Sequence, residues 1–365
     1  METGVIDARR RSLLAVLPAV WISGCGRAGA SPMASAEAPP APGRGTAVRT
    51  TPRPSVRSTH GRFAGAELGV GAALHGALPF PADNPWNTDI SAAPRDPQSD
   101  VLIASIGAGL SLQADFGAGL RHGQPIGIPY VVVDGSQPRV PVTWSVYGHE
   151  SDAGPYPLPK DAPIEGGGAP TNTGHRRVLV VDRDHDRLYE LFSATCNADG
   201  SWDAGCGAVF SLDSNTVRPT ARPGWSSADA AGLPIFPGLA RYEEAARGPG
   251  GIQHALRFTV QRSRQAFVPP ATHWASSNTN PSVAPMGMRV RLKAGYIIPP
   301  GFSVQTRAVL HALKSHGMIV ADHGPNWAIS GAPDPRWNDA ALAAELRQVR
   351  GSDLEVVRMD GLVTG

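Results

Sequence analysis

Three carboxylates near the middle of the chain, Glu150, Asp152 and Glu165, are the residues best suited to acid and base chemistry. Glu150 and Asp152 are two positions apart, so on an extended strand both side chains would face the same side. Cleavage of a glycosidic bond requires one protonated carboxyl group to donate to the leaving oxygen and one carboxylate to activate water or attack the sugar. The three residues therefore predict a glycoside hydrolase acting on a polysaccharide or oligosaccharide.

Two further polar residues are expected to assist these carboxylates. His175 follows a glycine run at 166–168, and Asp182 comes directly after the apolar residues 178–181. A histidine paired with a carboxylate can transfer protons near neutral pH. We therefore add His175 and Asp182 to the predicted catalytic set, although each acid could instead be a solvated loop carboxylate or a turn cap.

Aromatic residues in loops rich in glycine, proline and serine make a glycan the expected ligand, since sugar rings stack on indole and phenol surfaces. The candidates for substrate binding are Trp144, Tyr147, Tyr156, Trp225 and Trp274. The alternative is that these side chains fill the core, as large aromatic residues commonly do. Their exposure decides between the two readings.

The same residues are also compatible with two other functions. A polysaccharide lyase would act on a uronic acid through His175, Tyr156 or Arg177 rather than through a carboxylate pair. A non-catalytic envelope lipoprotein would use the same aromatic residues to bind glycan or peptidoglycan. Nucleic acid is not an expected partner, because 33 Lys and Arg against 31 Asp and Glu give a formal net charge of +2, with no basic block beyond the N-terminus.

Several common mechanisms leave local motifs that this sequence lacks. It has no Gly-x-Ser-x-Gly elbow, no His-Glu-x-x-His and no phosphate-binding loop. Asp182, Asp184 and Asp186 imitate the start of a calcium loop, but the glycine at its sixth position and the glutamate at its twelfth are missing. We expect no cofactor and no metal site.

The N-terminus is typical of an exported protein. Arg9-Arg10-Arg11 precedes a short apolar stretch over 12–21, which is too short to span a bilayer permanently. Ile22-Ser23-Gly24-Cys25 resembles the lipobox of bacterial lipoproteins, and this resemblance implies a lipid on Cys25 after removal of a signal peptide, residues 1–24. The prediction is a lipoprotein facing the periplasm or the cell exterior, attached to the membrane through this lipid only; a cytosolic, uncleaved N-terminus is the alternative.

The two remaining cysteines are predicted to form a disulfide bond. Cys196 and Cys206 flank a short segment whose centre is Asp199-Gly200, a dipeptide that favours tight hairpin turns. Such a turn would place the two thiols opposite each other, and an exported protein can keep the bond. Two free buried thiols are the alternative.

The chain divides into a tether and a folded part. Residues 25–78 are rich in Ala, Pro, Gly, Ser and Arg and lack a periodic apolar pattern, which predicts disorder. Residues 79–358 are predicted to form one β-rich domain, a sandwich or distorted barrel with two or three peripheral helices. The expected strands and hairpin are 129–133, 140–144, 177–181 with 188–192, 252–260, 287–292, 318–322 and 327–330. The expected helices are 99–106, 303–316 and 338–349.

Several motifs in the folded part resemble a family of uncharacterised secreted bacterial proteins. They are Asn84-Pro85-Trp86-Asn87, Gly154-Pro155-Tyr156-Pro157, the run 225–234 (WSSADAAGLP), the run 285–293 (PMGMRVRLK) and Ser330-Gly331-Ala332-Pro333-Asp334. The resemblance covers most of residues 79–357. It implies export and a single domain, and it implies no catalytic residue.

Overall fold

The apolar run ahead of Asp182 forms the centre of a five-stranded sheet. Its strands, in order across the sheet, are β13 (Cys206–Ser211), β10 (Arg187–Phe192), β9 (Val178–Asp182), β7 (Val131–Val133) and β2 (Gly69–Val70). β9 and β10 pair antiparallel from Asp182 opposite Arg187 to Val178 opposite Leu191, so the predicted hairpin is confirmed. All five residues of β9 are buried, because apolar side chains cover both faces of the sheet.

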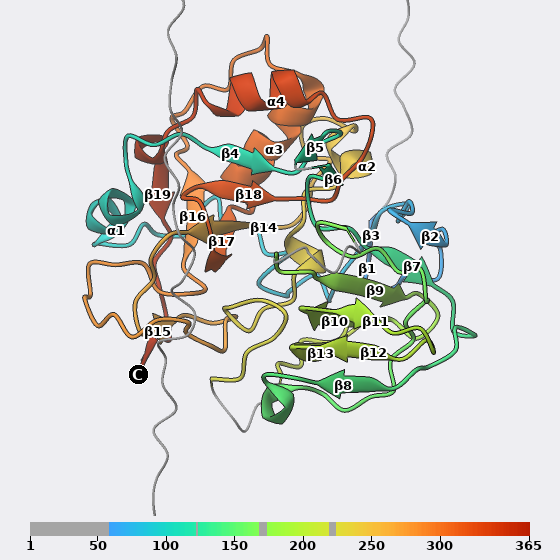
Figure 1. Cartoon of the computed structure of the whole chain (residues 1–365). Helices are drawn as coiled ribbons and strands as arrows, with labels where there is room; N and C mark the ends of the chain where they lie inside the picture. Colours follow the sequence, from blue (N-terminus) through green and yellow to red (C-terminus); the bar gives the residue numbers. More distant parts are fainter. Residues whose placement is uncertain (1–57, 122, 168–173, 219–223) are drawn as a thin grey trace, which may run out of the picture. The chain divides into compact units, whose positions relative to one another are not determined.

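A six-stranded sheet forms the other half of the folded part. Its order is β19 (Leu354–Val356), β16 (Arg289–Leu292), β17 (Met318–His323), β14 (Leu256–Val260), β18 (Ala328–Ser330) and β4 (Gln113–Asp115). β14 and β17 pair in parallel, although most neighbouring strands here are antiparallel. Figure 1 shows this sheet in one half of the fold, together with α1, α3 and α4, and the five-stranded sheet in the other half.

The remaining strands make smaller sheets. A three-stranded sheet has the order β11 (Thr195–Cys196), β12 (Trp202–Ala204) and β8 (Val142–Trp144). Three two-stranded pairs are β1 (Thr59–His60) with β3 (Ala77–Leu78), β5 (Leu120–Arg121) with β6 (Gln124–Pro125), and β15 (Ala266–Phe267) with β20 (Val363–Thr364). The fold is mostly β, as the sequence predicts. Over the described residues neither large sheet closes on itself, so the predicted alternative of a barrel is wrong.

Three of the four helices in the described residues lie where the sequence predicts them, and the short helix α2 (Tyr242–Ala245) was not predicted. The other three are α1 (Ser99–Ile106), α3 (Val304–Ser315) and α4 (Asp339–Leu346). The Ser303 hydroxyl accepts a hydrogen bond from the amide of Thr306 and so caps α3. Gly317 ends this helix at a positive φ of 69°, where a Cβ atom would lie 2.4 Å from the carbonyl oxygen of Val290. No helix in the described part of the chain is long and apolar enough to cross a membrane.

The computed structural model describes residues 58–121, 123–167, 174–218 and 224–365. These residues belong to one compact unit, Val56–Gly365. The fold therefore begins earlier than the predicted boundary at 79, because Phe63 is fully buried and β1 to β3 precede that boundary. It also ends later than 358, since β20 pairs with β15. The predicted signal peptide and Cys25 lie outside the described residues.

Two apolar clusters share the five-stranded sheet. Leu179 and Val181 face the larger cluster, which also contains Phe258 and Val320 of the six-stranded sheet. Val178 and Val180 of β9 belong to a second cluster, which the three-stranded sheet completes. The period of two along β9 therefore divides its side chains between a core shared with the six-stranded sheet and a smaller core on the opposite face.

The predicted disulfide bond between the two cysteines is not present in the structure. The Asp199-Gly200 turn does close a hairpin, but its register places Cys196 opposite Trp202. Cys206 lies opposite Phe192 in β13, and its thiol donates a hydrogen bond of 3.0 Å to the carbonyl oxygen of Ser227. The prediction failed because the chain leaves the hairpin for another sheet before it reaches Cys206.

We expect both thiols to be alkylated when the unfolded protein is treated with iodoacetamide without a reductant, because the register keeps them on different strands of different sheets. Mass spectrometry of the peptides checks this, and a sample reduced before alkylation is the control. A peptide pair linked through Cys196 and Cys206 would contradict the fold described for this segment.

Glu190 makes the stability of the fold depend on pH. This fully buried carboxylate of β10 accepts hydrogen bonds from the amides of Ile235 and Phe236 at 2.9 Å, yet burial raises its pKa to about 7. Between pH 4.5 and 7 the folded state therefore binds more protons at this site than the unfolded state does. The contribution of Glu190 to the free energy of unfolding is complete below that window and is lost as the pH rises through it.

Glu190→Gln should remove this dependence. Relative to the parent protein, the variant's free energy of unfolding should rise by about 3 kcal/mol between pH 4 and pH 8, since one pKa unit corresponds to about 1.4 kcal/mol. Urea unfolding at a series of pH values measures the difference. A difference that stays constant over this range would show that the pKa of Glu190 is the same in the folded and unfolded states.

Candidate functional site

Arg177, directly before β9, brings together two carboxylates from distant parts of the chain. Its Nη1 donates to the two carboxylate oxygens of Glu165 at 3.0 and 3.1 Å. Its Nη2 donates to Oδ2 of Asp322, the residue 145 positions further along. The Nε atom donates to the carbonyl oxygen of Ala228 at 3.3 Å. Arg177 is 3% exposed, so one buried guanidinium is shared by both carboxylates.

A second buried arginine, Arg257 of β14, extends this network. Its Nη2 donates to Oδ2 of Asp229 at 2.6 Å and lies 3.8 Å from Oδ2 of Asp322. Its Nη1 donates to the hydroxyl of Ser330 at 2.8 Å. Two guanidinium groups thus face three carboxylates, and every charge in the group has an opposite partner.

The two aspartates of this network have opposite pKa shifts. Burial raises the pKa of Asp229, and the negative charge of Asp322 adds to the rise, although Arg257 and the amide of Ala231 oppose it. Burial also acts to raise the pKa of Asp322, but the charge of Arg177, with contributions from His175 and Arg257, outweighs it and leaves this pKa below the usual range. Asp322 is therefore ionised at neutral pH.

His175 is the solvent-exposed member of the group. The positive charge of Arg177 lowers the pKa of His175, burial by surrounding protein lowers it further, and Asp322 and Glu165 oppose the shift. Within the described residues neither ring nitrogen has a hydrogen-bond partner, and the nearest ring is that of Phe192, 6.0 Å away between centroids. His175 is thus a neutral, accessible imidazole next to two carboxylates.

Two more histidines lie beside the same network. The Nδ1 atom of His273 is 2.8 Å from the carbonyl oxygen of Ala230, one residue after Asp229. The Nε2 atom of His323, next to Asp322, is 2.9 Å from the hydroxyl of Ser263. The segment around Ala230 is fixed to the end of β17, because Ala231 donates its amide proton to the carbonyl oxygen of Ala321.

We name the group of Glu165, His175, Arg177, Asp229, Arg257 and Asp322 the arginine–carboxylate cluster. The sequence predicts only Glu165 and His175 of this group as catalytic, with Arg177 in the lyase alternative. Asp322 was missed, although a signal exists: it is a carboxylate within a strongly buried apolar strand, where an unpaired charge would be very costly.

Glu150 and Asp152 do not belong to this cluster, which corrects the prediction that they act with Glu165. Glu150 ends the 3-10 helix Gly148–Glu150 rather than lying on a strand. Its Oε2 accepts hydrogen bonds of 2.8 Å from the amide and the hydroxyl of Ser226. Asp152 accepts from the amide of Val209 and pairs with Arg218. Both carboxylates therefore hold loops against β13.

Asp182 is also not close to Glu165 and His175, with which it was predicted to act. It lies at the opposite end of β9 from Arg177, roughly 16 Å away along an extended strand. Its carboxylate is buried, accepts a hydrogen bond from the amide of His185 and pairs with the ring of the same residue at 2.8 Å. Asp182 thus caps the turn between β9 and β10.

The acids after Asp182 are likewise used separately. Asp184 accepts a hydrogen bond from the amide of Gly135, and Asp186 accepts one from the amide of Phe63. The described residues contain no group of three or more His, Cys, Asp or Glu side chains arranged to hold a metal ion.

The predicted sugar-binding aromatic residues fall into two groups. Tyr156 is fully buried, and its hydroxyl donates to the carbonyl oxygen of Asp152, so the prediction that it binds substrate is wrong. Burial also raises the pKa of its phenol. The others are partly exposed; these are Trp144, Tyr147, Trp225 and Trp274. Trp144 packs edge-on against Tyr156, and Trp274 stacks on Phe267.

Among the predicted sugar-binding aromatic residues, Trp225 is the closest along the chain to the arginine–carboxylate cluster. It begins a segment whose next residue, Ser226, binds Glu150 and whose Ala228 carbonyl oxygen accepts the Nε proton of Arg177. On an extended chain the step from Trp225 to Ala228 is about 10 Å, roughly the length of two sugar residues.

Replacement of Arg177 by methionine should destabilise the protein by about 3–5 kcal/mol, because it leaves Glu165 and Asp322 without their shared counter-ion. Chemical unfolding at pH 7 measures this loss. The double variant with Asp322→Asn should lose less than the sum of the two single losses.

Arg187→Met is the matched control for this replacement. Arg187 lies on the neighbouring strand β10, and its side chain has no hydrogen bond or ion pair in the described structure. We expect a change within about 0.5 kcal/mol. Equal losses for the two arginines, or strict additivity in the double variant, would show that Arg177 does not hold the two carboxylates together.

No family model, curated protein or solved structure matches this chain.

Proposed function

We propose that this protein is a secreted carbohydrate-active enzyme, a glycoside hydrolase, whose reaction centre is formed by Glu165, His175 and Asp322. The observation that supports this most strongly is the sharing of Arg177 by two carboxylates, of which Glu165 is partly exposed and Asp322 is buried. Because each carboxylate lies within hydrogen-bond reach of one end of the same guanidinium, their separation is on the order of 5–8 Å. Glycoside hydrolases use carboxyl pairs separated by this range of distances.

The three residues divide the chemistry according to their exposure and charge. The Glu165 side chain is 21% exposed and the Asp322 side chain 10%, so Glu165 is the better placed to take a proton from an attacking water. Asp322 remains ionised and stabilises the positive charge that develops on the sugar. His175, in its protonated form, donates a proton to the leaving oxygen, and both groups then exchange protons with solvent.

The charge of the cluster favours a neutral glycan over a uronic acid. Both arginines are already paired with carboxylates of the protein, so neither is available to neutralise a substrate carboxylate. A lyase mechanism also loses Tyr156, which is buried away from the cluster. A hydrolase is therefore better supported than a lyase, although a neutral His175 is a group that a lyase could use as its base.

Export and attachment through Cys25 are part of the same proposal. They rest on the N-terminal pattern of arginines, apolar residues and lipobox. A glycan-cleaving enzyme held at the cell surface would meet polysaccharides that do not enter the cytoplasm.

Glu165→Gln and Asp322→Asn should each lower turnover on a cleaved polysaccharide by about a hundredfold or more, because the amides cannot accept the proton or supply the charge. New reducing ends, measured after incubation with a panel of polysaccharides, report hydrolysis. The rate should fall as the pH rises through the lowered pKa of His175. Unsaturated products absorbing in the ultraviolet, with a rate that instead rises through that pKa, would indicate a lyase.

Asp203→Asn, a change at an exposed carboxylate of β12, is the matched control and should keep parental activity. Glu150→Gln tests the original prediction, and its effect should be confined to thermal stability. Near-parental turnover in both Glu165→Gln and Asp322→Asn would rule out catalysis at the arginine–carboxylate cluster. Binding without any product would support a non-catalytic glycan-binding protein.

A further inference from the structure

A cavity of about 730 Å³ lies between the two halves of the fold. The side of the six-stranded sheet contributes Gly117, Ala118, Leu120, Gln124, Pro125 and residues 333–335, and the side of the five-stranded sheet contributes Val70, Lys160, residues 162–164, Gly166, Gly167 and Arg176. The halves approach closely here, since a Cβ atom on Gly167 would lie 1.9 Å from Oε1 of Gln124. This volume is in the usual range for a small-molecule site.

The cavity is distinct from the arginine–carboxylate cluster, although the same two segments form both. Ile164 and Gly166 line the cavity, and Glu165 between them binds Arg177 instead. Arg176 lines the cavity, whereas the side chain of the next residue, Arg177, points to the opposite side of the segment. A molecule in the cavity would therefore lie behind the proposed reaction centre.

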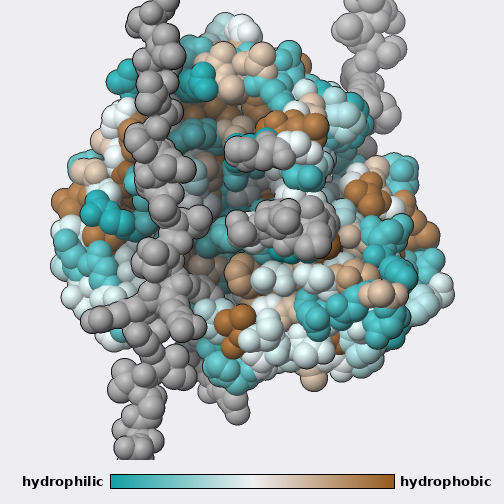
Figure 2. Space-filling view, viewed as in Figure 1, coloured by the Kyte–Doolittle hydropathy of each residue, from teal (hydrophilic) through white to brown (hydrophobic). Residues whose placement is uncertain are grey.

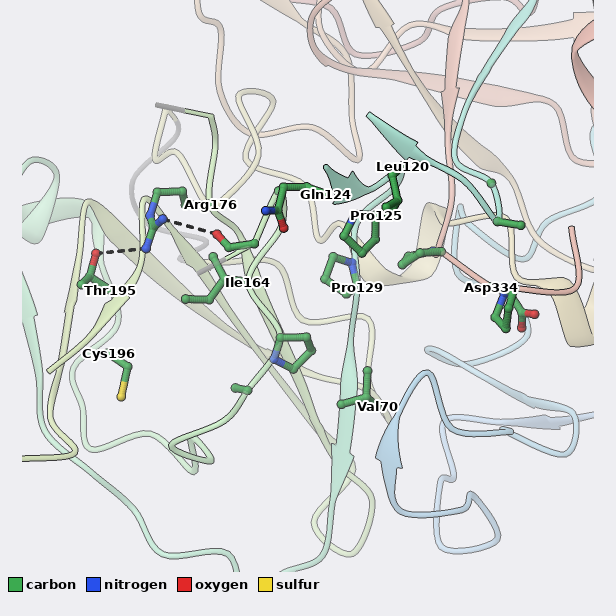
Figure 3. Close-up of a pocket in the computed structure, with 18 of the residues that line it drawn as sticks. Val70, Leu120, Gln124, Pro125, Pro129, Ile164, Arg176, Thr195, Cys196 and Asp334 are labelled. Carbon is green, nitrogen blue, oxygen red and sulfur yellow. Dashed lines mark hydrogen bonds between the residues drawn. The ribbon is translucent and has the colours of Figure 1, made fainter. Parts of the chain in front are cut away.

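The wall of the cavity is largely apolar and in part open to solvent. Leu120 is 66% exposed and Val70 63%, and these side chains come from opposite halves of the fold. Figure 3 shows Leu120, Pro125 and Pro129 in the middle of the site, with Val70 and Ile164 beside them. Exposed apolar side chains that border a cavity indicate an apolar ligand, because such a ligand removes both surfaces from water.

One end of the cavity carries positive charge. Lys160 donates to the carbonyl oxygen of Ala198 at 3.1 Å, and Arg176 donates to the hydroxyl of Thr195 at 3.4 Å, so both cations lie against the segment that contains β11. Figure 3 shows Arg176 and Thr195 at this end and Asp334 at the other. Asp334 pairs with Arg336 at 2.6 Å, so its charge is already balanced.

We propose that this cavity binds an amphipathic anion whose charged group lies near Arg176 and Lys160 and whose apolar body lies along Ile164, Leu120 and Val70. Acyl chains with a carboxylate or a sulfonate head belong to this class. The site goes beyond the proposed glycan cleavage, because none of these residues belongs to the arginine–carboxylate cluster.

Fluorescence of anilinonaphthalene sulfonate, an apolar anion, tests the site on the full-length protein. We expect saturable enhancement that dodecanoate reverses. Dodecyltrimethylammonium, which has the same chain length and the opposite charge, should compete about tenfold more weakly or worse, and sodium sulfate should not compete. Absence of saturable binding, or equal competition by the cationic and anionic amphiphiles, would overturn the proposal.

Two exposed positions allow the site to be altered with little risk to the fold. Leu120→Asp and Lys160→Glu should each weaken dodecanoate binding by about tenfold or more, the first by placing a charge along the apolar wall and the second by reversing a charge at the head-group end. Ile297→Asp is the matched control. Ile297 is 84% exposed and lies outside the cavity, so its variant should bind within about twofold of the parent.

The same variants distinguish binding of dodecanoate in the cavity from its binding to other apolar parts of the surface. Figure 2 shows apolar residues in several separate patches on one face of the molecule. If dodecanoate bound to such patches in general, Ile297→Asp would weaken binding as much as Leu120→Asp does. Equal effects of these two changes, with unaltered thermal stability, would locate binding outside the cavity.

Discussion

The pairing of Arg177 with Glu165 and Asp322 is the interaction on which the arrangement of the two halves depends. An unpaired guanidinium in this position would carry a large desolvation penalty, so the fold is stable only when carboxylates from both sides reach it. Glu165 comes from the side of the five-stranded sheet and Asp322 from the end of β17 in the six-stranded sheet. Apolar contacts between the two sheets are not directional, so they tolerate several relative positions of the sheets. The hydrogen bonds to Arg177 are directional and fit only one of these positions.

The same pairing also determines which groups of the arginine–carboxylate cluster carry a charge. Arg177 and Arg257 keep Asp322 ionised in spite of its burial, and the charge of Arg177 makes a proton on His175 less stable. Asp229, which has only one close arginine, is left with a raised pKa. Small differences in the number of cationic neighbours thus give adjacent groups of similar type different charges, which is a common feature of sites that transfer protons.

Local patterns in the sequence predicted many of the longer elements but not the site, and they missed β13, which pairs with β10. The hairpin of β9 and β10, the capped helix α3 and the apolar strand β17 follow from periodicity and from turn and cap residues. Glu150 and Asp152 were chosen because they are close in sequence, yet they hold different loops. Asp322 lies 145 positions from Arg177, and no local spacing relates the two.

The wrong predictions of the domain boundary and of the disulfide bond share one physical cause. The segment before residue 79 has few apolar residues, but several of them, among them Phe63 and Leu74, fill buried positions in the shared core. The turn after Cys196 was recognised correctly, whereas the change of sheet before Cys206 depends on which strand is available to pair with β10. In both cases the deciding contact is made with a part of the chain that lies far away in sequence.

Alternation of side chains along two short segments connects the two proposed sites. Glu165 and Arg177 face the cluster, while Ile164 and Arg176 face the cavity. Backbone hydrogen bonds join these segments directly, because Glu165 donates its amide proton to the carbonyl oxygen of Arg177 at 2.9 Å. A ligand that shifts either segment from the cavity side must therefore also shift the carboxylate of Glu165 relative to Asp322. The separation of the two carboxylates, on which the proposed chemistry depends, is thus determined by the packing on both faces of the segments.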